Sequence, residues 1–177
     1  MSFQDSLAVG KTGESLIARY FLNRGYSVLP VYEVLPGQYK GPVLYTSSGN
    51  MLVSPDMMVM GKGKIFWVEA KHKSAFTWHR ISQSWNTGID LHHYEQYLAI
   101  QALHQEIPIW LLFLHQNGKA KDTPEGLLSP AGLFGNTLSH LRDHEHHRDP
   151  RWGPHGMVYW DTSALKRIAP MAEVSHA

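Results

Sequence analysis

The chain has 177 residues, a formal net charge of +1 and no cysteine, and 43% of its residues are hydrophobic against 18% charged. This length can bury a full core, and the lack of cysteine excludes disulfides and thiolate metal sites, whereas the near-neutral charge neither requires nor excludes a nucleic-acid partner. No apolar run reaches the length of a membrane span and the first residues lack a secretion signal, so we expect a cytoplasmic protein with no membrane partner.

The first half of the chain predicts one helix and then three strands. Apolar residues recur at helical spacing over 12–24, and Gly25 supplies a stop. In order, the next segments are a strand over 26–35 that Pro30 weakens, a loop or loose hairpin over 36–50, a strand over 51–60, a turn over 61–64 and a strand over 64–71.

The second half predicts a helix and a buried strand before a less regular tail. Asp90 is a good N-cap for a helix over 91–105, and β-branched and aromatic residues predict a buried strand over 107–115. The remaining segments are 72–90 with no clear prediction, 116–150 as mostly loop with weak helical hints, 155–161 as a last strand and 163–168 as a short helix. The order of the first six elements, α-β-β-β-α-β, favours an α/β sandwich with a mixed sheet.

Three charged residues lie where the predicted hairpin over 51–71 should be apolar. If Lys62 and Gly63 form a two-residue corner, the numbers of paired residues sum to 125, which sets Asp56 opposite Glu69. Side chains alternate along a strand, so Glu69 and Lys71 share one face. The three side chains are therefore expected to converge at one end of the hairpin.

This combination of groups suits phosphodiester hydrolysis. Two carboxylates held this close resist joint ionisation, and a divalent cation such as Mg²⁺ or Mn²⁺, which prefers oxygen ligands, relieves their repulsion. The cation can polarise a phosphoryl oxygen and lower the pKa of a bound water, while a neighbouring lysine stabilises negative charge on the phosphate.

The pattern Pro55-Asp56, twelve residues, then Glu69-Ala70-Lys71 resembles the PD-(D/E)xK nuclease superfamily, in particular its Holliday-junction-resolvase and phage-nuclease type. The resemblance covers roughly 12–115. It implies an α/β, restriction-endonuclease-like α-β-β-β-α-β core with a central mixed sheet flanked by helices.

The same resemblance implies roles for single residues. Asp56 and Glu69 would bind the catalytic metal, the backbone carbonyl of Ala70 would add a ligand, and Lys71 would position the attacking water. Glu14, at the start of the first helix, would complete the metal shell directly or through water.

Simpler interpretations compete with these roles. Glu69 and Lys71 could form an exposed ion-paired edge beside a strand that begins at Asp56. Against this, Trp67 shares their face, whereas a merely solvated face is more often polar throughout. Glu14 could simply complement the dipole of the helix N-terminus.

Two further segments could contact the substrate. The run 71–80 combines cations with aromatic rings, which can grip phosphates and stack on bases, so Lys73, Trp78, His79 and Arg80 are candidate nucleic-acid contacts rather than a solvated charge run. Trp85 is interpreted as a core residue.

On the helix over 91–105, the stripe of Tyr94 and Gln101 could flank the site and touch a phosphate or a base. A separate apolar strip of Leu91, Leu98 and Ala102 is expected to face the sheet. Ordinary packing with a polar rim is the alternative for the tyrosine and glutamine.

The histidine-rich run 140–149 has one spacing that can bind zinc, since His140 and His144 are a helical turn apart if the segment is helical. No His-Glu-x-x-His pattern is present there, so we interpret the run as an exposed polar loop.

The sequence therefore predicts a metal-dependent deoxyribonuclease that cuts endonucleolytically, with RNA not excluded as a substrate. The alternatives are a non-catalytic nucleic-acid-binding protein and a partner-dependent subunit on the same fold. We expect one nuclease domain over 1–177, with its core over 12–115 and an extension over 116–177. One domain must dimerise to cut both strands in a coordinated way, so a homodimer is a further expectation.

Overall fold

The computed structural model describes residues 3–31, 43–118, 120 and 123–175, and within the first helix it describes side chains from Thr12 onward. Among these residues, no helix is long and apolar enough to cross a membrane. The part of the predicted strand and loop over 32–42 lies outside the described residues.

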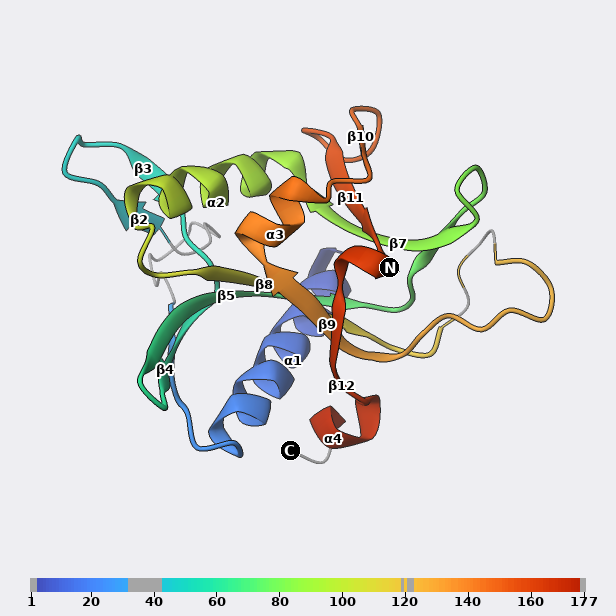
Figure 1. Ribbon diagram of the computed structural model, residues 1–177, viewed down its shortest axis with the longest axis horizontal. Helices are drawn as coiled ribbons and strands as arrows, with labels where there is room; N and C mark the ends of the chain where they lie inside the picture. The colour runs from blue at the N-terminus through green and yellow to red at the C-terminus, as the bar shows by residue number, and fades with distance from the viewer. Residues whose placement is uncertain (1–2, 32–42, 119, 121–122, 176–177) are drawn as a thin grey trace.

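Six strands of the described residues form a central mixed sheet (Figure 1). Their order across the sheet is β1 (Ser27–Pro30), β4 (Met57–Gly61), β5 (Lys64–Lys73), β8 (Ile109–His115), β9 (Gly132–Thr137) and β12 (Lys166–Ala169). β5 and β8 run parallel, and the other neighbouring pairs run antiparallel. The predicted central mixed sheet is confirmed.

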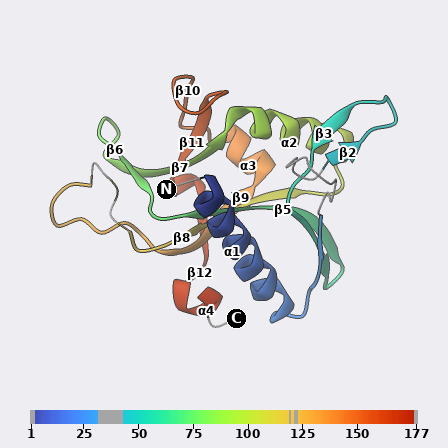
Figure 2. The ribbon, with the colours of Figure 1, turned by 180° about the vertical axis from the view of Figure 1, so that it is seen from behind.

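One face of the central sheet is covered by α1 (Phe3–Leu22) and α4 (Met171–Ser175), and α1 lies in front of the sheet in Figure 2. Ile17, Tyr20 and Phe21 of α1 pack on the even-numbered side chains of β5, which include Val68. These apolar residues recur at helical spacing, so burying them gives the helix its fixed place on the sheet.

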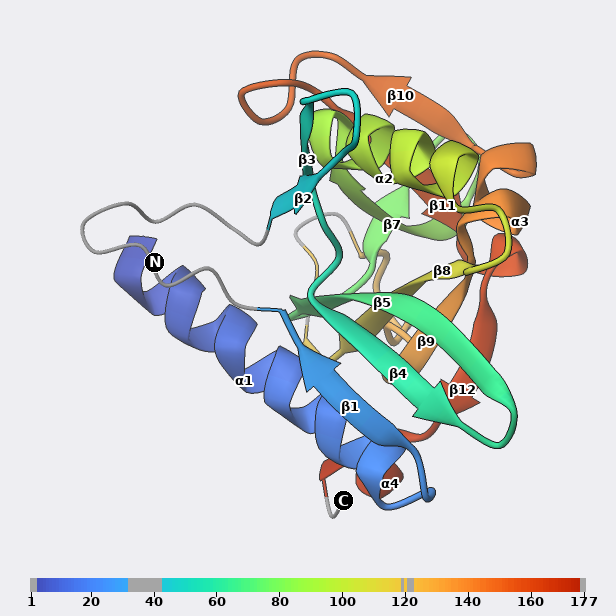
Figure 3. The same ribbon diagram turned by 90° about the vertical axis from the view of Figure 1, so that its left-hand side faces the viewer.

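The opposite face is covered by α2 (Leu91–Leu103), α3 (Leu138–Asp143) and a second sheet, which we call the outer sheet. Figure 3 shows α1 and α2 on opposite sides of the β4–β5 hairpin. The outer sheet has the order β10 (His147–Asp149), β11 (Met157–Asp161), β7 (Ser84–Asp90) and β6 (Thr77–His79), with every pair antiparallel. The core on this face is rich in aromatic residues and includes the buried Trp160.

Two short elements complete the fold. β2 (Val43–Tyr45) and β3 (Met51–Val53) pair with each other, which agrees with the loose hairpin expected in this region, and β3 packs beside α2. A 3₁₀ helix, η1 (Thr162–Ala164), connects β11 to β12.

The prediction of one strand over 51–60 was wrong, because β3 and β4 are separate strands with different partners. The break lies at Pro55, which has no N–H to donate to a sheet ladder. The chain changes direction there and brings Asp56 to the start of β4.

The predictions for 72–90, 116–150 and 163–168 missed strands β6, β7, β9, β10 and β12. In β9, Gly135 is packed so tightly that a Cβ atom would lie 2.2 Å from the carbonyl oxygen of Leu111. Close approach between strands therefore requires a glycine, a residue that weakens a strand prediction. The strand predicted over 155–161 is confirmed as β11, although it is not the last strand.

The packing face predicted for α2 was only partly right, because Leu91 and Leu98 pack against the core but are not its most buried residues. Tyr94, Tyr97 and Ile100 are buried against the core, whereas Leu98 is half-buried and Ala102 is exposed. Large aromatic rings bury more area than leucine, and their hydroxyl groups find polar partners inside.

Candidate active site

A two-residue turn sets the register of the β4–β5 hairpin. Lys62 and Gly63 occupy it with φ angles of 53° and 69°, the positive values that a type I′ turn requires. Gly61 then pairs with Lys64, and the pairing continues along both strands without a slip. The register predicted from the sequence is confirmed.

Asp56 lies one residue before β4, next to the last pair of the hairpin, in which Met57 is opposite Val68. Its Oδ2 accepts a hydrogen bond from the backbone N–H of Ala70 at 2.8 Å. This bond holds the half-buried carboxylate beside Glu69, the residue that precedes Ala70 on β5.

Glu69 and Lys71 point away from α1, toward the face covered by α2. The Lys71 Nζ forms an ion pair with Oε1 of Glu69. Glu69 is only 1% exposed, whereas 29% of the Lys71 side chain remains accessible. The ion pair therefore joins a buried carboxylate to a lysine whose side chain is partly accessible.

Charge and burial oppose each other at this site. Burial raises the pKa of Asp56 well above its usual range, and the negative charge of Glu69 raises it further. Lys71 and the N–H of Ala70 favour the ionised form without reversing that shift. Burial disfavours the charge on Lys71, but Glu69 and Asp56 outweigh it and raise the lysine's pKa above its ordinary value.

Glu14 approaches the same site from α1. It is half-buried, and its charge raises the pKa of both Asp56 and Lys71. The neighbouring Gly13 allows this approach, because a Cβ atom there would lie 2.4 Å from the Cβ of His72 on β5. The helix thus contacts the strand closely where the predicted site residues meet.

The oxygen donors fit a hard divalent cation. Among the described residues, no group of three or more His, Cys, Asp or Glu side chains is arranged to hold a metal ion. Asp56 and Glu69 still supply two carboxylates, and Oε2 of Glu69 is buried with no hydrogen-bond partner among the described residues. Mg²⁺ commonly binds proteins through one or two carboxylates and keeps several waters, so this donor set suits it.

Comparison with known proteins identifies the fold. No protein-family model matches the sequence, and no curated protein matches it significantly. The structure of Hjc, a Holliday junction resolvase from the archaeal hyperthermophile Archaeoglobus fulgidus, aligns over 94% of this chain and 95% of that chain, with a TM-score of 0.50 and 10% identity. The chain has a restriction-endonuclease-like fold. The structure of D212, a fusellovirus nuclease, aligns over 98% of this chain and 90% of that chain with a TM-score of 0.43 and 9% identity.

On this restriction-endonuclease-like fold, α2 brings two further residues to the site. The buried Tyr97 hydroxyl lies against Glu69, and burial together with the charges of Glu69 and Asp56 raises its pKa well above 10. His93 lies near enough to Lys71 that the ammonium, together with burial, lowers the imidazole pKa. Sequence reasoning missed His93, because its position one turn into a helix carries meaning only once that helix is known to face the site.

Lys73 extends the positive charge along β5. Burial and the charge of Lys71 lower its pKa to about 8. Within the described residues it makes no ion pair. An approaching phosphate would supply the opposite charge that this lysine lacks.

The other predicted contacts of this segment lie on and beside the β6–β7 hairpin. Trp78 is half-buried and packs edge-to-face against Trp85, with ring centroids 5.0 Å apart. His79 Nδ1 and Ser82 Oγ are hydrogen-bonded at 2.7 Å, and Arg80 is exposed at the hairpin turn. Trp85 packs against the core as expected, although it is only partly buried.

Tyr94 and Gln101 make internal hydrogen bonds. The Tyr94 hydroxyl is buried and donates to Glu145 Oε1 at 2.6 Å. The Gln101 amide accepts from the N–H of Ile109 at 2.9 Å and donates to the carbonyl of His104 at 3.2 Å. These bonds anchor α2 to the start of β8, so we do not include either residue in a substrate surface.

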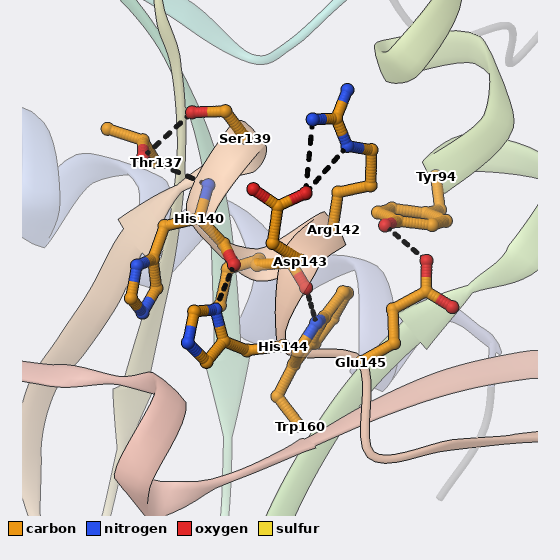
Figure 4. A network of polar contacts seen from close by, with 10 residues as sticks. Tyr94, Thr137, Ser139, His140, Arg142, Asp143, His144, Glu145 and Trp160 are labelled. Atoms are coloured by element: carbon orange, nitrogen blue, oxygen red, sulfur yellow. Dashed lines mark hydrogen bonds and ion pairs between the residues drawn. The ribbon is translucent and has the colours of Figure 1, made fainter.

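The histidine-rich run is partly helical rather than a loop. His140 and His144 stack with ring centroids 4.0 Å apart, and His144 Nδ1 donates to the carbonyl oxygen of His140 at 2.8 Å (Figure 4). Trp160 Nε1 donates to the carbonyl of Leu141 and ties α3 to the core. The zinc interpretation gains no support, because no third His, Cys, Asp or Glu side chain of the described residues joins these two rings in a metal-binding group.

Proposed function

We propose that this protein is a metal-dependent nuclease that hydrolyses phosphodiester bonds of DNA, cutting within the strand. One observation carries the proposal: Asp56 and Glu69 are held together beside Lys71 on a restriction-endonuclease-like fold. Burial raises the pKa of Asp56 and the charge of Glu69 raises it further, and a bound cation would relieve both effects.

Asp56, Glu69 and the backbone carbonyl of Ala70 would hold Mg²⁺ or Mn²⁺, and Glu14 would complete the shell directly or through water. When bound, such an ion polarises a phosphoryl oxygen and lowers the pKa of a coordinated water. Because the pKa of Asp56 is raised, a metal ion would compete with a proton for this carboxylate, and metal binding should strengthen as pH rises.

Lys71 and Lys73 act on the phosphate. Glu69 orients the Lys71 ammonium group, which can stabilise negative charge that builds on the scissile phosphate. Lys73, two residues further on the same face of β5, can contact a neighbouring phosphate. A water oxygen attacks phosphorus, the bond to the 3′ oxygen breaks, and the products carry a 5′-phosphate and a 3′-hydroxyl.

The proposal is tested by incubating the protein with plasmid, linear, single-stranded and four-way-junction DNA, and with RNA. Each substrate is used with Mg²⁺, with Mn²⁺ and with EDTA. We expect metal-dependent cutting of DNA that Asp56→Asn and Lys71→Met abolish. Asp143→Asn, which changes an exposed acid on α3, is the matched control and should cut like the native protein.

Each other outcome has a clear meaning. Cutting that survives Asp56→Asn would place the active site elsewhere. DNA binding without cutting of any substrate would contradict the proposed nuclease activity and favour the non-catalytic or partner-dependent alternative. Light scattering with and without junction DNA tests the homodimer that coordinated cutting of two strands needs.

A further inference from the structure

The outer sheet is strongly curled, and its outer face is concave. His79 lies on β6 at one edge and His147 on β10 at the other, yet their ring centroids are only 4.8 Å apart. Strands β7 and β11 lie between these edges, and a flat sheet spaces adjacent strands by about 4.8 Å, which would separate the edges by about 14 Å. The two imidazoles therefore meet across the hollow of the sheet.

A pocket of about 650 Å³ occupies this region. Tyr159 lines it, and its ring stacks on His147 with centroids 4.6 Å apart and planes 10° apart. Gly88 gives this ring its room, because a Cβ atom there would lie 2.8 Å from the Tyr159 Cδ1. The pocket thus has a flat aromatic wall built by residues of three strands.

Asn86 places an unsatisfied hydrogen-bond acceptor in the pocket lining. The residue is only 2% exposed, and its Nδ2 donates to the carbonyl and hydroxyl oxygens of Ser84, both at 3.0 Å. Its Oδ1 is buried and accepts no hydrogen bond from any described residue. A buried polar atom without a partner costs about 1–3 kcal/mol, so a ligand that donates to it gains affinity.

The rim of the pocket carries an aromatic ring and a cation. Trp152 is 64% exposed, and the Arg151 side chain is 83% exposed while it pairs with Asp149. Exposed tryptophan offers a stacking surface, and arginine suits a phosphate. An exposed indole ring, one buried acceptor and a cation at the mouth match a nucleobase that carries an exocyclic amino group and a phosphate.

The pocket and the N-cap of α2 share one face of β7. Asn86 and Asp90 point to the same face of that strand and are four residues apart, which spans about 13 Å. Asp90 caps α2, and its charge acts on the same Tyr97 hydroxyl as Glu69 and Asp56. A nucleic-acid strand that runs from Asn86 past Asp90 would approach α2, the helix that carries Tyr97.

We propose that this pocket binds an unpaired nucleobase of the DNA substrate, held by stacking on the exposed Trp152 and by an amino group that donates to Asn86. The inference rests on the proposed function and names the kind of substrate, DNA with unpaired nucleotides near the cut. Adenine, cytosine and guanine carry the required amino group, whereas thymine does not.

The test measures binding in EDTA, by fluorescence anisotropy, of single-stranded dA12, dC12 and dT12 and of a fully paired duplex. We expect dA12 and dC12 to bind about tenfold more tightly than dT12. Asn86→Leu should remove that preference, and Trp152→Ala should weaken every single strand about tenfold without changing duplex binding. Leu128→Ala, which truncates another exposed apolar side chain, is the control and should bind like the native protein.

Trp152 lies at the exposed rim, so its variant keeps the test valid even if Asn86→Leu unfolds. Equal binding of dA12 and dT12 together with an unaffected Trp152→Ala would overturn the inference. Free dAMP that binds as tightly as dA12 would also overturn it, because the pocket would then serve a mononucleotide rather than a strand.

Failure of the inference and failure of the proposed function can be told apart. Asp56→Asn should keep the preference for dA12 over dT12, because the pocket does not use the catalytic acids. If the protein cuts DNA with metal and Trp152→Ala binds single strands like the native protein, the nucleobase pocket is rejected and the nuclease function stands. If Asn86→Leu abolishes the base preference but the native protein cuts no substrate, the nuclease function is rejected and the nucleobase pocket stands.

Discussion

The β4–β5 hairpin and the outer sheet present two different kinds of polar site. The hairpin holds buried charges that oppose each other, and its groups come from one short stretch that ends at Lys71. The concave face of the outer sheet holds stacked rings and an amide with charged side chains at the rim, drawn from the distant segments 77–88 and 147–159. Charge suits a site that activates a phosphate, whereas flat neutral surfaces suit a site that selects a base.

The largest expected effect tests whether the charges of the hairpin serve chemistry alone. Glu69→Gln should lower the rate of DNA cutting on the order of a thousandfold, because it removes one of the two carboxylates proposed to hold the metal. Single-turnover cutting in Mg²⁺ measures this. Glu125→Gln, at an exposed position, is the control, and the preference for dA12 over dT12 should stay unchanged in both variants. A joint loss of cutting and of this preference in Glu69→Gln would mean that the two sites are one.

The second prediction concerns the link between the two sheets. His115 of the central sheet is fully buried, and its Nε2 is 3.1 Å from the hydroxyl oxygen of Thr87 in the outer sheet. Burial lowers the His115 pKa to about 3. The native protein therefore stays unprotonated where the unfolded chain takes up a proton, so this contribution to stability is full above pH 6.5 and falls as pH drops toward 3.

Through this residue, lowering the pH from 7 to 5 should reduce the free energy of unfolding of the native protein by about 2 kcal/mol. Urea unfolding of the native protein and of His115→Gln at both pH values measures it, since glutamine can bond to Thr87 but does not titrate. His92→Gln, at an exposed position, should keep the native pH dependence. If the pH dependence of unfolding is unchanged in His115→Gln, acid destabilises the protein through other groups.

The third prediction compares two tyrosines of the same helix. Tyr97→Phe removes the hydroxyl that lies against Glu69 and should weaken Mn²⁺ binding about tenfold, as loss of a residue that orients a metal ligand usually does. Calorimetric titration with Mn²⁺ measures this. Tyr94→Phe removes a hydroxyl that contacts Glu145 instead, and it should bind Mn²⁺ like the native protein. Equal losses in the two variants would indicate a general effect on α2.

The smallest expected effect concerns phosphate contacts. Lys73→Gln should weaken duplex binding a few-fold and reduce the slope of log affinity against log salt by about one. Lys64→Gln, an exposed lysine at the other end of β5, should leave the slope unchanged. If both lysines change the slope equally, the DNA duplex contacts the whole length of β5 rather than only its end near Lys71.

Only groups that lie close together in the sequence could be placed correctly from the sequence. Asp56, Glu69 and Lys71 lie on two strands joined by a two-residue turn, so alternation and one turn type were enough to bring them together. The buried face of α2 was predicted only in part, because its Tyr94 hydroxyl finds a partner 51 residues away. The pocket was not predicted at all, since Asn86 and Tyr159 become neighbours only when β7 and β11 pair.

The meeting of His79 and His147 has a mechanical consequence for the outer sheet. β6 and β10 are its two edges, and no strand pairing joins them in the described residues, whereas the rings of His79 and His147 stack between them. The gap between these edges can widen while every strand keeps its ladder intact. The pocket can therefore widen to bind ligands of different size by losing a few ring contacts, without breaking any strand pairing.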